Sequence, residues 1–90
     1  MFVRHYYVSG LVQGVGYRYF TQTVAVRYGI RGWVRNMSDG RVEIRAEADA
    51  DALGKFRSEL ERGPLAAQVA GVVEQEALLS EALTSFSIRG

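Results

Sequence analysis

Apolar and polar residues alternate with a period of two in several short stretches of the chain, which is the pattern of β-strands with one buried face. Residues 41–47 alternate most clearly and predict a strand with one buried and one wet face. Its buried set would be Val42, Ile44 and Ala46. Residues 30–37 predict the preceding strand, and Ser-Asp-Gly at 38–40 predicts the hairpin loop between the two, with Asp39 and Gly40 at positive φ.

The N-terminal residues 2–9 are rich in aromatic and β-branched side chains and predict another strand. We expect Tyr6 and Val8 to face the core and the strand to end at Gly10. His5 would then lie on the other face of the sheet, as a half-exposed residue and not as a catalytic base.

Two longer stretches have apolar residues at intervals of three and four, the helical period. Residues 17–28 form the first stretch, and Gly29 is placed to end it. The second begins at a cap provided by Asp49 or Asp51 and ends at the Gly-Pro pair 63–64. The expected buried stripes are Tyr17, Phe20, Val24 and Tyr28 in the first helix and Leu53, Phe56 and Leu60 in the second.

The last quarter of the chain has a weaker pattern. Residues 68–76 predict a fourth strand, residues 85–89 predict a short last strand, and residues 77–84 fit a helix or a loop equally well. The order βαββαβ plus a terminal strand predicts an α+β, ferredoxin-like fold, with two helices on one face of an antiparallel sheet. We expect residues 1–90 to form one domain.

The composition excludes several classes of site. Without cysteine there can be no disulfide, thiolate metal site or cysteine nucleophile, and a single histidine argues against a histidine metal site or a Ser-His-Asp triad. No run reaches the roughly 18 apolar residues of a membrane span, and the N-terminus lacks a signal-peptide pattern. We therefore expect a cytoplasmic protein with no membrane partner.

The net charge of +1 hides an asymmetry. Residues 1–45 carry seven arginines against two carboxylates, a net charge of +5, and residues 46–90 carry −4. A basic half of this size favours a small anionic ligand over a long polyanion. The alternative is that the two halves interleave in space and cancel.

Residues 10–18 join the first strand to the first helix and contain the candidate chemistry. Gly14 and Gly16 can adopt positive φ, so that successive backbone N–H groups turn inward and form an anion-binding concavity. The first N–H groups of the helix would face the same spot, and Arg18 adds a permanent charge with a planar fork of donors. This predicts a phosphate-sized anion site, against the alternative of an ordinary turn followed by a solvated arginine. The motif is neither a Walker loop nor a Rossmann fingerprint, because both the glycine spacing and the Lys-Ser/Thr pair are missing.

Two segments stand out together: Gly10-x-Val12-Gln13-Gly14-Val15-x-Tyr17-Arg18 and Gly32-Trp33-Val34-x-Asn36-x-x-Asp39-Gly40-x-Val42. They resemble the two signature motifs of the acylphosphatases, in the right order and at the usual separation. Two long motifs at fixed spacing are far more specific than either alone, and the resemblance covers essentially the whole chain. It departs from the family at Met37, where a small or hydroxyl residue is common, and is loose over residues 66–83.

The resemblance implies hydrolysis of an acyl phosphate to a carboxylate and inorganic phosphate, without metal or cofactor. It implies Arg18 and Asn36 as catalytic residues. The phosphate cradle would consist of Gln13, Gly14, Val15, Gly16, Tyr17 and Arg18. The expected partners are a small acyl phosphate as substrate and inorganic phosphate as product and inhibitor, with no nucleic acid, and a monomer is expected.

The residue types suit this chemistry in their own right. An acyl phosphate already has a good leaving group, so catalysis needs charge stabilisation and a positioned water more than a strong nucleophile. Arg18 and the loop N–H groups would hold the phosphoryl oxygens, and the Asn36 amide would orient the water without titrating. A substrate phosphate oxygen can accept the proton. Taken alone, Asn36 is also an ordinary residue beside a turn.

Three other interpretations stay open. RNA-recognition domains share the βαββαβ order, but they place aromatic residues on the third strand, where residues 41–47 have none. A regulatory module could keep the anion site and perform no chemistry, since fold alone does not give function. The domain could also work inside a larger protein, although a 90-residue chain with its own start methionine favours a free-standing one.

Overall fold

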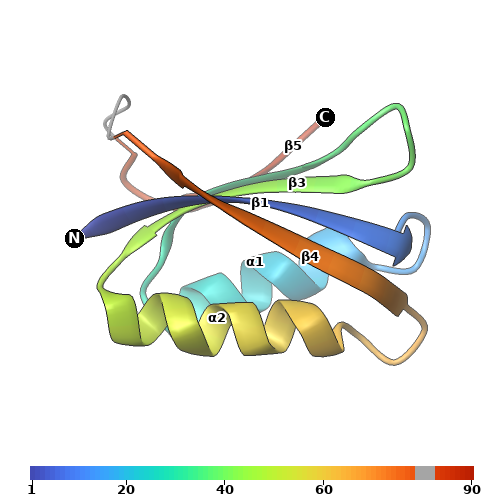
Figure 1. The fold of residues 1–90 in the computed structure, drawn as a ribbon, viewed down its shortest axis with the longest axis horizontal. Helices are drawn as coiled ribbons and strands as arrows, with labels where there is room; N and C mark the ends of the chain where they lie inside the picture. Colours follow the sequence, from blue (N-terminus) through green and yellow to red (C-terminus); the bar gives the residue numbers. More distant parts are fainter. Residues whose placement is uncertain (79–82) are drawn as a thin grey trace.

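The chain forms one five-stranded sheet with two helices on one of its faces, as Figure 1 shows. The computed structural model describes residues 1–78 and 83–90. Its elements are β1 (Phe2–Leu11), α1 (Tyr17–Arg27), β2 (Arg31–Asn36), β3 (Val42–Ala48), α2 (Ala50–Arg62), β4 (Gln68–Ala77) and β5 (Phe86–Arg89). This confirms the predicted ferredoxin-like order.

The sheet has the strand order β4-β1-β3-β2-β5. The first four strands pair in antiparallel fashion, as expected, whereas β5 lies parallel to β2 and makes the sheet mixed. The three antiparallel pairings make β4 run opposite to β2, so a fifth strand that returns from β4 to the opposite edge runs in the direction of β2. The direction of β5 thus follows from the strand order and not from its own residues.

The first strand runs one residue past the glycine at which it was expected to end. The pairing of β1 with β4 shifts between Ser9 and Gly10, and Gly10 has φ 119°. A Cβ atom at this position would lie 2.2 Å from the carbonyl oxygen of Gln68. Gly10 therefore marks a bulge where β4 passes close to the backbone of β1, and the strand continues to Leu11.

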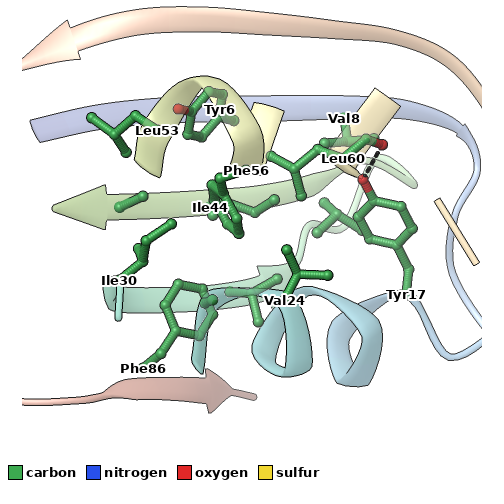
Figure 2. Close-up of a cluster of buried hydrophobic side chains, with 14 of the residues drawn as sticks. Tyr6, Val8, Tyr17, Val24, Ile30, Ile44, Leu53, Phe56, Leu60 and Phe86 are labelled. Atoms are coloured by element: carbon green, nitrogen blue, oxygen red, sulfur yellow. Dashed lines mark hydrogen bonds between the residues drawn. The ribbon is translucent and has the colours of Figure 1, made fainter. Parts of the chain in front are cut away.

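The core lies between the sheet and the two helices (Figure 2). Tyr6 and Val8 of β1 are fully buried there, as their alternation predicted. The predicted stripe of α2 is buried as well, and in α1 Tyr17 and Val24 are buried while Phe20 and Tyr28 are partly buried against the core. Leu53, Phe56 and Leu60 form the α2 stripe. Burial of this apolar surface packs both helices against the same face of the sheet (Figure 1).

The predicted helix ends are confirmed. Asp49 is the N-cap of α2, and its carboxylate accepts a hydrogen bond from the N–H of Ala52 at 2.8 Å. Gly29 and Gly63 follow the two helices with φ of 67° and 68°, the left-handed region that suits glycine after a helix.

The β2–β3 hairpin differs from the prediction in one detail. Gly40 has φ 94°, but Asp39 has no positive φ. The Asp39 carboxylate instead accepts hydrogen bonds from the backbone N–H of Arg41 and from its guanidinium group, and these bonds hold the pKa of Asp39 below its usual value. A single glycine is enough for this turn, because the aspartate side chain bonds to the backbone two residues on.

The predicted wet face of β3 is wrong, because all seven residues of the strand are buried. Glu43, Arg45 and Glu47 are 8%, 7% and 2% exposed. The strand lies in the centre of the sheet, where long side chains of β1 and β2 cover it. Glu43 pairs with His5 and with Arg35, and although burial raises the pKa of Glu43, these hydrogen bonds lower it to below its usual value.

The end of the chain agrees with the predicted strands. Residues 68–77 form β4 at the sheet edge, and Phe86 and Ile88 of β5 face the core, the first buried and the second half-buried. Half of the predicted helix or loop at 77–84 lies outside the described residues, since residues 79–82 are not described.

Candidate active site

A small pocket opens where the chain leaves β1 and enters α1, beside the end of β2. Its volume is about 180 Å³. It is lined by Val12, Gly14, Gly16, Tyr17, Arg18, Tyr19 and Asn36. The structure therefore brings the two residues expected to be catalytic, Arg18 and Asn36, into one pocket, although they are 18 positions apart in the chain.

The glycine-rich loop has the backbone conformation that an anion site needs. Gly14 and Gly16 have φ of 74° and 79°, and nothing lies within 4 Å of a Cβ placed on either. The backbone N–H groups of residues 14–16 donate no hydrogen bond to any described residue. These two glycines are needed for the backbone angle and not for space, so the loop can turn its N–H groups toward the pocket that it lines.

The first turn of α1 adds further donors at the same place. Gly16 is the N-cap, no side chain caps the helix, and no acidic residue lies in its first turn. The carbonyl of Gly16 accepts the first helical bond, from the N–H of Phe20, so the N–H groups of residues 17–19 have no partner within the helix. An uncapped helix start of this kind attracts anions, because its free N–H groups carry partial positive charge and the positive end of the helix dipole lies at the same place.

Arg18 differs from most arginines of the chain. Seven of the others pair with a carboxylate: Arg4, Arg27, Arg35, Arg41, Arg45, Arg57 and Arg62. Arg18 is half-buried and makes no hydrogen bond or ion pair with any described residue. Because Arg4 and Arg27 pair with Glu74 and Glu59 of the acidic half, the two halves do interleave, and much of the N-terminal positive charge is neutralised within the protein. The positive charge of Arg18 is not neutralised by any described residue.

Asn36 is the last residue of β2 and lines the same pocket as the glycine-rich loop. Its backbone is held in register with Val42 of β3. The side-chain oxygen Oδ1 is buried and has no hydrogen-bond partner among the described residues. A buried amide oxygen without a partner is costly, and it is therefore ready to accept a hydrogen bond from a bound molecule.

Three residues of the expected phosphate cradle direct their side chains elsewhere. The Gln13 amide donates to the carbonyls of Met37 and Arg41, at 2.8 and 3.0 Å, and Val15 packs against the core. The Tyr17 hydroxyl donates to the carbonyl of Leu60 at 2.7 Å, and burial raises the pKa of Tyr17 (Figure 2). At these three positions only the backbone is left to face an anion.

Sequence reasoning missed two residues that line the pocket, Val12 and Tyr19. Val12 is 1% exposed and forms part of the floor, whereas Tyr19 is 74% exposed. Both lie in or next to the stretch that joins strand and helix, so their positions in the sequence are the signal that could have placed them at the pocket. Helical periodicity cannot place Tyr19, because it falls outside the apolar stripe of α1.

A second hollow, of about 350 Å³, lies between α1 and α2 and is lined by Tyr28, Lys55, Ser58, Glu59 and Arg62. It is larger, but its charges are already matched, since Glu59 pairs with both Arg27 and Arg62. None of the described residues that line it is a glycine at positive φ or lies in the first turn of a helix. The smaller pocket thus has the chemistry of a site, and the larger one does not.

None of the helices in residues 1–78 and 83–90 is long and apolar enough to cross a membrane. In the same part of the chain, no three His, Cys, Asp or Glu side chains are grouped as metal ligands would be.

The chain is similar to proteins of one known family. The acylphosphatase family model matches residues 4–88. An acylphosphatase of Pasteurella multocida is 44% identical over 89 residues, which cover 99% of both chains. One of Pseudomonas paraeruginosa is 48% identical over 85 residues, covering 94% of this chain and 92% of that one. The crystal structure of the acylphosphatase from Bacillus subtilis matches with a TM-score of 0.96 at 39% identity and covers 100% of both chains.

Proposed function

The chain belongs to the acylphosphatase family, enzymes that hydrolyse the carboxyl–phosphate bond of acyl phosphates, and we propose that Arg18, Asn36 and the loop N–H groups perform this reaction. Arg18 and the N–H groups of residues 14–19 bind the phosphoryl oxygens. Asn36 orients the water that attacks the phosphorus atom.

In this proposal the water forms a bond to phosphorus while the bond from phosphorus to the acyl oxygen breaks. The products are a carboxylate and inorganic phosphate, and a phosphate oxygen takes the proton of the attacking water. Because the carboxylate is a good leaving group, the enzyme's main task is to hold the reactants and stabilise the charge on the phosphoryl oxygens. The positive φ of Gly14 and Gly16 sets the backbone of the loop before substrate arrives, and Arg18 adds its charge in the same pocket. Donors arranged in advance stabilise developing charge effectively.

Asn36 supplies an acceptor for the water. Its Oδ1 is buried and unpartnered among the described residues, so a hydrogen bond from a water would satisfy it. An amide does not titrate, and it therefore keeps this role over a wide pH range. The negative charge of a carboxylate at the same place would repel the phosphoryl group.

One observation carries the proposal: the unpaired Arg18, two glycines at positive φ and the unpartnered Oδ1 of Asn36 all line one pocket. The experiment is inhibition of benzoyl phosphate hydrolysis by inorganic phosphate, which should be competitive in the parent protein. Arg18→Ala should raise the inhibition constant at least about tenfold. Arg31→Ala is the matched control, since Arg31 also lacks a carboxylate partner in the described chain but lies outside the pocket. Equal effects of the two substitutions would contradict the proposal.

We also propose that no metal takes part, because Arg18 and six backbone N–H groups can supply the positive charge that a metal ion would. Hydrolysis rates should therefore be the same with and without EDTA. Loss of activity in EDTA and its recovery with Mg²⁺ or Zn²⁺ would contradict this part of the proposal.

No nucleic-acid partner is included in the proposal. The aromatic rings on the open face of the sheet are covered by arginines: Arg89 lies 4.7 Å from the centre of the Trp33 ring, and Arg41 lies 5.0 Å from that of Tyr7. Rings covered in this way are not free to stack on bases. We propose a monomer, since a single chain provides every group assigned to the site. A cytoplasmic location is also part of the proposal.

A further inference from the structure

The pocket is too small to enclose a whole substrate with a large acyl group. Its volume of about 180 Å³ is below the roughly 300–1,000 Å³ of clefts that bury drug-sized ligands. Val12 and Tyr17, each 1% exposed, close its floor. Under the proposed function, the phosphoryl group occupies this space between the loop, Arg18 and Asn36, so the acyl group must extend outward past the rim.

Tyr19 is the exposed large side chain at that rim. It is 74% exposed, lies directly after Arg18 in the first turn of α1 and lines the pocket. Its ring makes no ring contact, hydrogen bond or ion pair with any described residue. By contrast, Tyr17 is buried and Phe20 packs against the core. Packing and hydrogen bonding within the protein therefore do not account for the place of the Tyr19 ring.

We propose that the Tyr19 ring is the binding platform for the acyl group, and that the enzyme prefers acyl phosphates with an aromatic or large apolar acyl group over acetyl phosphate. This inference rests on the proposed function, because it places the phosphoryl end at Arg18. An aromatic ring beside the pocket can stack on a benzoyl group and remove its apolar surface from water. A methyl group reaches little of that ring, so acetyl phosphate gains little from it.

The test compares kcat/KM for benzoyl phosphate and acetyl phosphate in matched variants. Tyr19→Ala should lower kcat/KM for benzoyl phosphate about tenfold and that for acetyl phosphate by no more than about twofold. Tyr19→Phe keeps the ring and should stay within about twofold of the parent for both substrates. Val26→Ala is the control, because Val26 is 67% exposed on the same helix and does not line the pocket.

Inhibition by inorganic phosphate separates this inference from the proposed function. Tyr19→Ala should leave the phosphate inhibition constant within about twofold of the parent, since phosphate has no acyl group and alanine keeps the backbone N–H of residue 19. If Tyr19→Ala lowers kcat/KM equally for both substrates, or for neither, the acyl assignment is wrong while phosphate inhibition still supports the site at Arg18. If phosphate does not inhibit even the parent, the proposed function fails and the acyl assignment fails with it.

Discussion

The side-chain amide of Gln13 lies 2.8 Å from the carbonyl oxygen of Met37, so the glycine-rich loop is tied to the residue that follows Asn36. The same amide also donates to the carbonyl of Arg41 at 3.0 Å. Met37 and Arg41 bond to each other across the base of the β2–β3 hairpin. One glutamine thus sets the distance between the phosphate loop and the strand that carries Asn36.

Gln13→Ala should therefore lower kcat by about tenfold or more and change the inhibition constant of phosphate much less, because the loop itself keeps its glycines. Both carbonyls retain one backbone partner, so the free energy of unfolding should fall by only about 1–2 kcal/mol. Gln22→Ala is the matched control, since its amide also donates to a carbonyl, that of Phe86, away from the pocket. An equal loss of kcat in both variants would mean that Gln13 acts only through stability.

Arg18→Lys should remove most of the activity although the positive charge is kept. A lysine ammonium is a point charge and cannot match the planar fork of a guanidinium group on two phosphoryl oxygens. We expect kcat/KM for benzoyl phosphate to fall about 100-fold. Arg31→Lys serves as the control. Activity within about threefold of the parent, less than about 1 kcal/mol of barrier, would show that Arg18 is not the phosphate clamp.

Asn36→Ala should lower kcat by about 100-fold and leave the inhibition constant of phosphate within about twofold, because a group that orients water acts mainly in the transition state. Steady-state kinetics with and without added phosphate measure both quantities. A parallel loss of kcat and phosphate affinity would instead make Asn36 a phosphate ligand. A thermal melt of the variant checks that the end of β2 still pairs with β3.

The two most buried tyrosines should respond in opposite ways to loss of the hydroxyl. The Tyr17 hydroxyl donates to Leu60, so Tyr17→Phe leaves a buried carbonyl without this partner and should lower the free energy of unfolding by about 1–3 kcal/mol. The Tyr6 hydroxyl is buried and has no partner among the described residues, so Tyr6→Phe should cost nothing or stabilise the protein. Urea unfolding of both variants measures the difference, and a clear loss in Tyr6→Phe would contradict it.

The difference in the free energy of unfolding between Tyr6→Phe and the parent should depend on pH. Burial, with a smaller contribution from Glu74, raises the pKa of Tyr6 to about 12, whereas an unfolded tyrosine ionises near 10. Above pH 10 the unfolded state therefore loses a proton that the folded state keeps, and stability falls as the pH rises toward 12. Tyr6→Phe removes this contribution, so its advantage over the parent should grow between these two pH values.

Local signals predicted most of the fold, and long-range pairing explains what they missed. The helix caps and glycine stops depend on neighbouring residues, so Asp49, Gly29 and Gly63 could be placed from the sequence. The central position of β3 depends on partners up to 46 residues away, such as Phe2 paired with Ala48. Alternation of charged residues therefore predicted a wet face at Glu43 and Glu47, which neighbouring strands in fact cover.

The candidate site divides in the same way. Positive φ at Gly14 and Gly16 is a property of the residue type and was predicted correctly. The direction of a side chain is not set by the residue type. The sequence placed Gln13 in the phosphate loop, but it could not show that the Gln13 amide donates to the carbonyl of Met37 in the hairpin. The juxtaposition of Arg18 and Asn36 came from the resemblance of two motifs, because no local pattern in either segment indicates that they share a pocket.

Inorganic phosphate, the product of the reaction, should bind Arg18 and the loop N–H groups that donate to no described residue, and so stabilise the folded protein. A ligand that binds only the folded state adds RT ln(1 + [L]/Kd), which is about 2.7 kcal/mol at 100 times its Kd. For a domain of this size, at about 4–8 °C per kcal/mol, the melting midpoint should rise by roughly 10 °C or more. Chloride at matched ionic strength is the control, because general screening acts similarly in both salts.

The Kd from the melting series should equal the inhibition constant from kinetics, and Arg18→Ala should remove most of the rise in the melting midpoint. If phosphate at tens of millimolar neither inhibits nor raises the midpoint beyond chloride, the loop from Gly14 to Arg18 is not an anion site, and the roles proposed for Arg18 and Asn36 fail together.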